Sequence, residues 1–146
     1  MLLGRESGDH LSVVALRRSE PESSLDFERD WLDVEIAVAA GAFRGAYAAV
    51  MSSADLADFR SGLERVHSTL TGSCQLDAEE RALVLTMTGD GRGHVRVKGV
   101  ACDQLEDGNE LHFVLELDQT EIAPAFAELD ALLRAFPPVG RATGQR

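Results

Sequence analysis

Long apolar runs are absent from this chain of 146 residues. The longest contiguous apolar run covers residues 46–51, whereas a membrane-spanning helix needs about 20 apolar residues. The N-terminus reaches Glu6 soon after two leucines and has neither the basic region nor the long apolar region of a secretory signal. We therefore expect a cytoplasmic protein that neither crosses nor binds a membrane.

Basic residues and cysteines are also scarce. The chain has 14 Lys and Arg residues against 25 Asp and Glu residues, a formal net charge of -11 at pH 7, and Lys98 is its single lysine. This acidity disfavours binding to nucleic acids, because their phosphates carry the same sign of charge. Cys74 and Cys102 form no C-x-x-C motif, so we expect reduced thiols rather than a disulfide.

Motifs for catalysis and phosphate binding are missing as well. The sequence contains no G-x-x-x-x-G-K-[ST], G-x-S-x-G, H-E-x-x-H or EF-hand pattern. Cys102 and His112 can approach each other across a predicted hairpin, but two ligands without a third indicate a buried thiol beside a surface histidine more than a zinc site. We expect no cofactor, no metal and no enzymatic activity. The alternative is a small-ligand-binding or enzymatic α+β domain with no recognisable catalytic motif.

Hydrophobic periodicity indicates the fold. The composition, with 45% hydrophobic and 27% charged residues, is that of a globular protein, and we expect one domain over residues 1–138 with a flexible C-terminal tail at 139–146. Apolar spacing of three and four predicts amphipathic helices over residues 53–70 and 120–136, the second capped by Thr120. We read residues 19–30 as a solvated loop, and we find no internal repeat. We expect residues 1–6 to form the first strand of a hairpin. Period-two alternation predicts further strands over residues 10–18, 31–38, 43–51, 81–88, 94–102 and 110–118.

This order of elements predicts an α+β fold. We expect an antiparallel β-sheet of about six to eight strands with two amphipathic helices packed against it, because strands and helices do not alternate as in a parallel sheet. The edge strands of such a sheet would allow two copies to pair as a homodimer.

Acidic residues concentrate in two segments. Residues 19–35 contain seven acids and one base, and residues 103–121 contain seven acids and no base. If the fold brings these segments together, they form a negative face that attracts a basic partner and raises its association rate. The alternative is a solvated surface that only keeps the protein soluble. The predicted partner-binding residues are Asp26, Glu28, Asp30, Asp33, Glu35, Asp103, Glu106 and Asp107.

Four segments in this order resemble a known family. They are the opening M-L-L-G, D-W-L-D-V-E-I from Asp30, M-S-S-A-D-L entering the first helix, and E-L-H-F-V-L-E-L before the second. The layout resembles the bacterial WapI-like family, which is associated with immunity to contact-dependent polymorphic toxins. The resemblance implies a non-enzymatic cytoplasmic protein that binds and neutralises a toxin domain, and many such toxins are basic nucleases. Carboxylates would then occupy the place of substrate phosphates, backed by an apolar anchor such as Trp31 or Phe27, although Trp31 can equally be a core residue.

Overall fold

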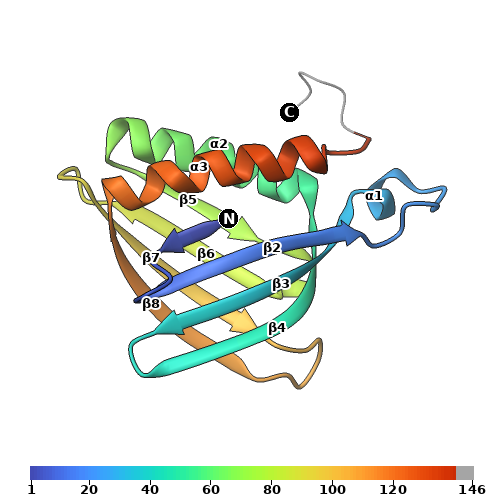
Figure 1. Cartoon of the computed structure of the whole chain (residues 1–146), viewed down its shortest axis with the longest axis horizontal. Helices are drawn as coiled ribbons and strands as arrows, with labels where there is room; N and C mark the ends of the chain where they lie inside the picture. Colours follow the sequence, from blue (N-terminus) through green and yellow to red (C-terminus); the bar gives the residue numbers. More distant parts are fainter. Residues whose placement is uncertain (141–146) are drawn as a thin grey trace.

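The computed structural model describes residues 1–140 and shows two four-stranded antiparallel sheets within them (Figure 1). The α+β class and the eight strands confirm the prediction, although the strands divide between two sheets instead of forming one. The first sheet contains β1 (Leu2–Gly4), β2 (His10–Arg18), β3 (Trp31–Ala40) and β4 (Phe43–Ser52). The second contains β5 (Ser73–Asp77), β6 (Leu83–Gly89), β7 (His94–Cys102) and β8 (Glu110–Asp118).

Period-two alternation gives each sheet one apolar face, as the sequence predicts. In β3, Leu32, Val34 and Ile36 are buried, whereas the acids between them point outward. The buried rows of both sheets join in one hydrophobic core, to which β7 and β8 contribute Val97 and Leu115. Burying such an aliphatic side chain completely stabilises the fold by about 1.5 to 3 kcal/mol, so this core provides the main driving force for folding.

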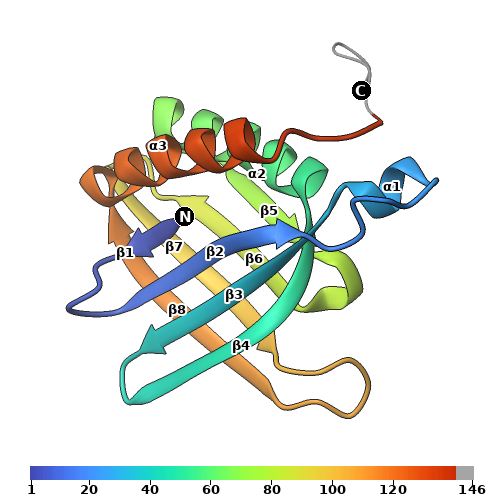
Figure 2. The same cartoon turned by 45° about the vertical axis from the view of Figure 1, so that its right-hand side comes forward.

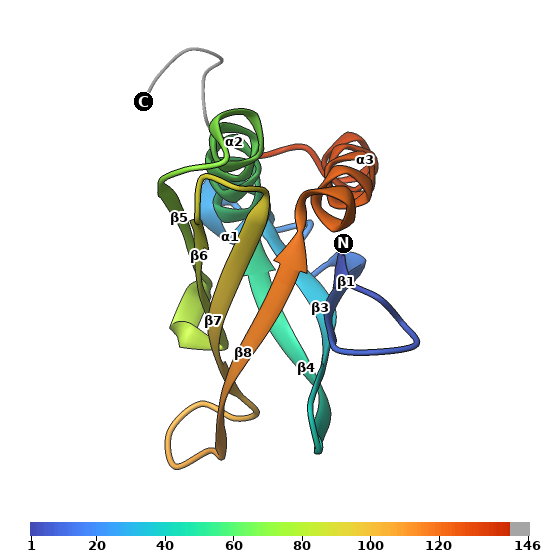
Figure 3. The same ribbon diagram turned by 90° about the vertical axis from the view of Figure 1, so that its left-hand side faces the viewer.

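Two amphipathic helices cover one side of the two sheets. α2 (Ser53–Thr69) packs against β5, α3 (Gln119–Ala135) packs against β1, and the helices contact each other (Figure 3). The Ser52 hydroxyl caps α2 by accepting from the Asp55 N–H at 3.1 Å. Thr120 was predicted to cap the second helix, but the cap is Asp118, two residues earlier. The Asp118 carboxylate accepts from the Thr120 N–H at 2.9 Å. Within residues 1–140, no helix combines the length and apolar character that a membrane crossing requires.

The two halves of the chain repeat one architecture. Each half runs through a four-stranded antiparallel meander and ends in a helix that packs on the sheets, although the amino-acid sequence shows no repeat. Strand β5 was not predicted, because this five-residue strand has only two inward apolar positions, Cys74 and Leu76. Gly62 of α2 lets this strand approach, since a Cβ atom there would lie 2.6 Å from the Cβ atom of Cys74.

The segment before β3 contains more regular structure than expected, and it contacts the start of the predicted tail. Residues 19–30 contain a four-residue helix, α1 (Asp26–Arg29), where the sequence predicts a loop. The predicted tail begins at Val139, whose N–H donates to Asp30 Oδ1 at 2.9 Å. Residues 141–146 of that tail lie outside the described residues.

The two free thiols should differ in reactivity. Burial raises the pKa of Cys74 to about 11, so little of the reactive thiolate forms near neutral pH. Cys102 is only half-buried, and its Sγ lies 3.0 Å from the Gln104 carbonyl oxygen. With Ellman's reagent at pH 8, we expect one fast-reacting thiol that Cys102→Ser removes, and a second that reacts only when the protein is unfolded. Two equally fast thiols in the folded protein would contradict this assignment.

Candidate partner-binding site

Asp33 and Glu35 lie on the outer face of the first sheet. The Ser19 hydroxyl donates to Asp33 Oδ1 at 2.6 Å, and Arg17 Nε donates to Asp33 Oδ2 at 2.8 Å. These two hydrogen bonds lower the pKa of Asp33 and engage its charge within the chain. Glu35 is exposed and is paired in register with Ala48 of the edge strand β4. Of these two acids, Glu35 is therefore the more accessible to a partner.

Asp30 lies in the interior and connects four elements. Its Oδ2 accepts from the Ser52 hydroxyl at 2.8 Å and from the Ala54 N–H at 2.9 Å, while Oδ1 accepts from Val139. The Arg18 guanidinium lies 3.9 Å from Oδ1. Only 4% of Asp30 is exposed, and its carboxylate holds the start of α2 and the end of the chain together.

The other predicted acids lie in two exposed segments. Asp26 of α1 is exposed and pairs with Arg29, and the half-buried Glu28 accepts from the Ser23 hydroxyl. The remaining three are exposed in the β7–β8 loop. There the Asp103 carboxylate accepts from the Asn109 side chain at 3.0 Å and from its N–H at 2.8 Å, which lowers the pKa of Asp103. Glu106 and Asp107 follow in left-handed conformations.

A third acidic segment, which was not predicted, connects these two exposed segments. It is the short 3-10 helix η1 (Glu79–Arg81) between β5 and β6, in which Glu79 and Glu80 are exposed. In the sequence, this segment is marked only by two adjacent acids before a predicted strand. Its place in the fold depends on β5, which was not predicted. Figure 2 shows α1, the β5–β6 connection and the β7–β8 loop following one another along the right-hand side of the molecule. We refer to this region as the acidic end, which comprises Asp26, Asp55, Glu79, Glu80, Asp103, Glu106 and Asp107.

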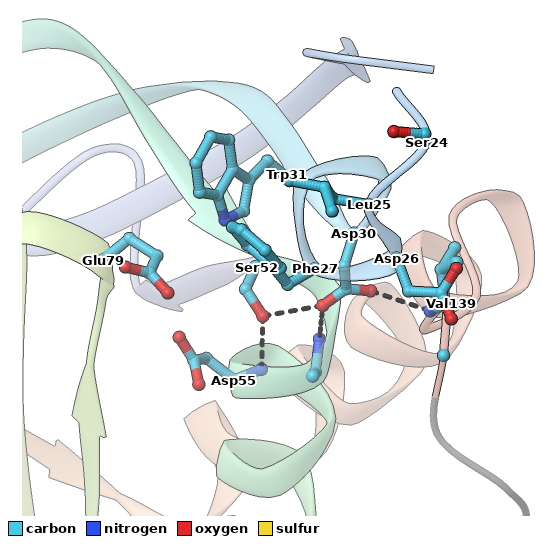
Figure 4. Close-up of a pocket in the computed structure, with 12 residues that line it drawn as sticks. Ser24, Leu25, Asp26, Phe27, Asp30, Trp31, Ser52, Asp55, Glu79 and Val139 are labelled. Carbon is cyan, nitrogen blue, oxygen red and sulfur yellow. Dashed lines mark hydrogen bonds between the residues drawn. The ribbon is translucent and has the colours of Figure 1, made fainter. Parts of the chain in front are cut away.

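The acidic end contains a pocket of about 610 Å³ between α1, the start of α2 and η1 (Figure 4). Leu25 and Phe27 line it and expose 46% and 59% of their surfaces. The Phe27 and Trp31 rings meet edge to face, with their centroids 5.7 Å apart. Asp55 and Glu79 add carboxylates to the same pocket. The pocket therefore combines exposed apolar side chains, which are typical of interaction sites, with carboxylates at its rim.

A second pocket of about 250 Å³ extends the acidic end toward the β7–β8 loop. It shares Glu79 with the first pocket and also contacts Asp103 and Leu105, of which Leu105 is 57% exposed. The Tyr47 hydroxyl donates to the Ala82 carbonyl oxygen at 2.6 Å and fixes η1 next to β4. Burial raises the pKa of Tyr47 to about 12, so this donor keeps its proton.

The chain matches the model of a known protein family. The model of the "Immunity protein WapI-like family" matches residues 1–137. The chain belongs to the WapI-like immunity protein family. This confirms the resemblance inferred from the sequence.

Other comparisons bear on the fold of this WapI-like protein. A search of curated proteins finds no match. Among solved structures, a chain of the Trypanosoma bruciei MRP1/MRP2 crystal structures is similar with a TM-score of 0.51 and 13% sequence identity, covering 94% of this chain and 84% of that chain. At this identity the similarity shows the fold alone.

On the outer face of the second sheet of the WapI-like protein, basic side chains and histidine lie beside acids. Arg96 Nε lies 3.5 Å from Glu116 Oε1, and His112 Nε2 lies 3.0 Å from Glu110 Oε2. His112 pairs in register with Val100, which leaves it diagonal to Cys102 rather than opposite. In the described part of the chain, no group of three or more His, Cys, Asp or Glu side chains is placed to hold a metal ion.

Proposed function

We propose that this WapI-like protein neutralises a toxin domain by binding a basic surface of that domain with its acidic end. The observation that carries the proposal is the pair of exposed apolar side chains, Leu25 and Phe27, beside a carboxylate-lined pocket. Membership of an immunity family supports a role in protein binding. Glu28, Asp33 and Glu35 flank the acidic end and would contribute to its negative field.

The two kinds of side chain would act differently in binding. Phe27 and Leu105 would be desolvated in the complex and supply most of the affinity, because buried aromatic and aliphatic anchors dominate interfaces. The carboxylates would attract the partner over a distance and raise the association rate. In a toxin that binds phosphates, the same carboxylates would occupy the basic cleft and exclude the substrate.

The test needs a cognate toxin domain, which is to be sought among the proteins encoded beside the gene of this chain. We expect Glu79→Lys with Glu80→Lys to weaken binding at least tenfold at low salt, mainly through a slower association, because opposite charges are replaced by like charges. In 0.5 M salt the wild-type affinity should also fall, since screening limits charge interactions to a few ångströms. The measurement is surface plasmon resonance at both salt concentrations.

A matched control changes the net charge equally at the other end of the molecule. Glu6→Lys with Glu116→Lys alters the β1–β2 turn and the outer face of β8, away from α1 and η1 (Figure 1). This control should bind as the wild type does. Equal loss of affinity in both double variants would show that only the net charge matters, and wild-type binding by Glu79→Lys with Glu80→Lys would overturn the proposed surface.

A further inference from the structure

We infer that two copies of this chain pair through the open edge of β4, which joins their first sheets into one continuous antiparallel sheet. Strand β4 is the last of the four strands of the first sheet, and within residues 1–140 no strand pairs with its other side. Figure 1 shows β4 along the lower side of the first sheet. The N–H and C=O groups on that side can therefore bond a further strand.

Strand β4 lacks the features with which proteins protect an open edge. Its ten residues run in unbroken register with β3, and they include neither proline nor lysine. Residues 43–48 are exposed apart from the half-buried Tyr47. A long, regular and exposed edge is a template for pairing with another chain.

The other edge strands are less suited to pairing between two copies. Strand β1 has only three residues, and β5 packs against α2. Strand β8 carries Glu110, Glu116 and Asp118, so two copies paired along it would concentrate acids. Strand β4 carries a single charged side chain, Arg44.

The charges on the outer face identify the second strand as β4 of another copy. Arg44 and Glu35 are both exposed, and neither belongs to an ion pair within the described residues. Glu35 is paired in register with Ala48. When Ala46 lies opposite Ala46 of the second copy on a two-fold axis, Arg44 lies opposite Ala48 of that copy. Glu35 of the second copy then follows in the same row, one strand further on.

Arg44 can reach this Glu35 because only the methyl group of Ala48 lies between them. Two strand spacings place the Cα atoms of Arg44 and Glu35 roughly 10 Å apart, which the two extended side chains together span. The two-fold axis repeats this ion pair. On the inner face, the same register places Phe43, which is 65% exposed, beside Ala49 of the second copy and removes part of its ring from water.

Sedimentation equilibrium of the purified full chain, without any toxin, tests the inference. An interface of this small size should give a reversible dimer with a dissociation constant on the order of 10 µM. Arg44→Glu should raise this constant about tenfold, because two cross-strand attractions become repulsions. Arg92→Glu, an equal change of charge at an exposed position in the β6–β7 turn, should leave the constant unchanged.

A charge reversal tests the register. Glu35→Arg alone should also weaken the dimer about tenfold, whereas Glu35→Arg with Arg44→Glu restores opposite charges in each row and should restore dimerisation. Circular dichroism and the melting temperature confirm that each variant is folded. The inference would be overturned by a wild type that stays monomeric at concentrations well above this constant, by equal effects of Arg44→Glu and Arg92→Glu, or by a double variant as weak as the single ones.

The inference and the proposed function can fail separately. Residues 43–49 do not line the pocket of about 610 Å³, and the dimer is measured in the absence of the toxin domain. A monomeric protein that binds the toxin domain through its acidic end would leave the proposed function intact and remove the dimer. A dimer whose toxin binding survives Glu79→Lys with Glu80→Lys would remove the proposed surface and leave the dimer.

Discussion

Replacing Asp30 with alanine is expected to lower the free energy of unfolding by about 3 to 5 kcal/mol, as removal of one partner from a buried ion pair does. The substitution leaves the Ser52 hydroxyl and the N–H groups of Ala54 and Val139 without their acceptor. It also leaves the Arg18 guanidinium, which is mostly buried, without its carboxylate. In thermal unfolding followed by circular dichroism, the melting temperature should fall by about 10 °C or more.

Asp33→Ala is the matched control for this prediction. Asp33 also pairs with an arginine, but Arg17 is largely exposed, so the pair should contribute less than about 1 kcal/mol. A melting temperature of Asp30→Ala within about 2 °C of the Asp33→Ala value would show that the Asp30 network adds nothing to stability.

Asp30 illustrates why sequence reasoning places charged residues poorly. In the sequence it is one of several acids before a strand, and nothing local separates it from Asp26 or Asp33. The difference arises from Val139, which is 109 positions away in the sequence. Acidic residues are usually solvated, so a buried one is recognisable only when the tertiary structure shows its hydrogen-bond donors.

The elements with strong periodicity were predictable. Helix α2 and strand β3 have several apolar positions at spacings of 3.6 and two, and their observed bounds agree closely with the prediction. The division into two sheets was not predictable, since period two reveals which face is buried but not which strand forms the next pair. The short elements β5 and α1 lack enough turns or alternations to give a pattern.

The candidate site was predictable only in part, because it also depends on contacts between segments far apart in the sequence. Phe27 was named as an apolar anchor, and it is exposed next to the pocket. Asp26 and Asp103 belong to the acidic end, but Glu79 joins them only through the connection from β5 to β6. A site assembled from three separated segments depends on which strands pair across the chain. Local patterns in a single sequence do not reveal that pairing.

Gly99→Ala is expected to lower the free energy of unfolding by about 2 to 3 kcal/mol, the upper part of the range for overpacking a dense core. Gly99 of β7 faces inward opposite Phe113 of β8, and a Cβ atom there would lie 2.2 Å from Cζ of the Phe113 ring. Phe113 is only 6% exposed, so its ring has little room to move aside. Urea unfolding of the purified variant measures the change.

The steric cause can be tested by making room for the new methyl group. Phe113→Leu alone should destabilise the fold because it leaves a cavity, but the double variant Gly99→Ala with Phe113→Leu should be more stable than the sum of the single effects predicts. Additive effects would show that the cost of Gly99→Ala does not come from the ring. Because β7 and β8 also carry the loop with Asp103 and Leu105, distorting this strand pair should weaken toxin binding, and the double variant should regain part of it.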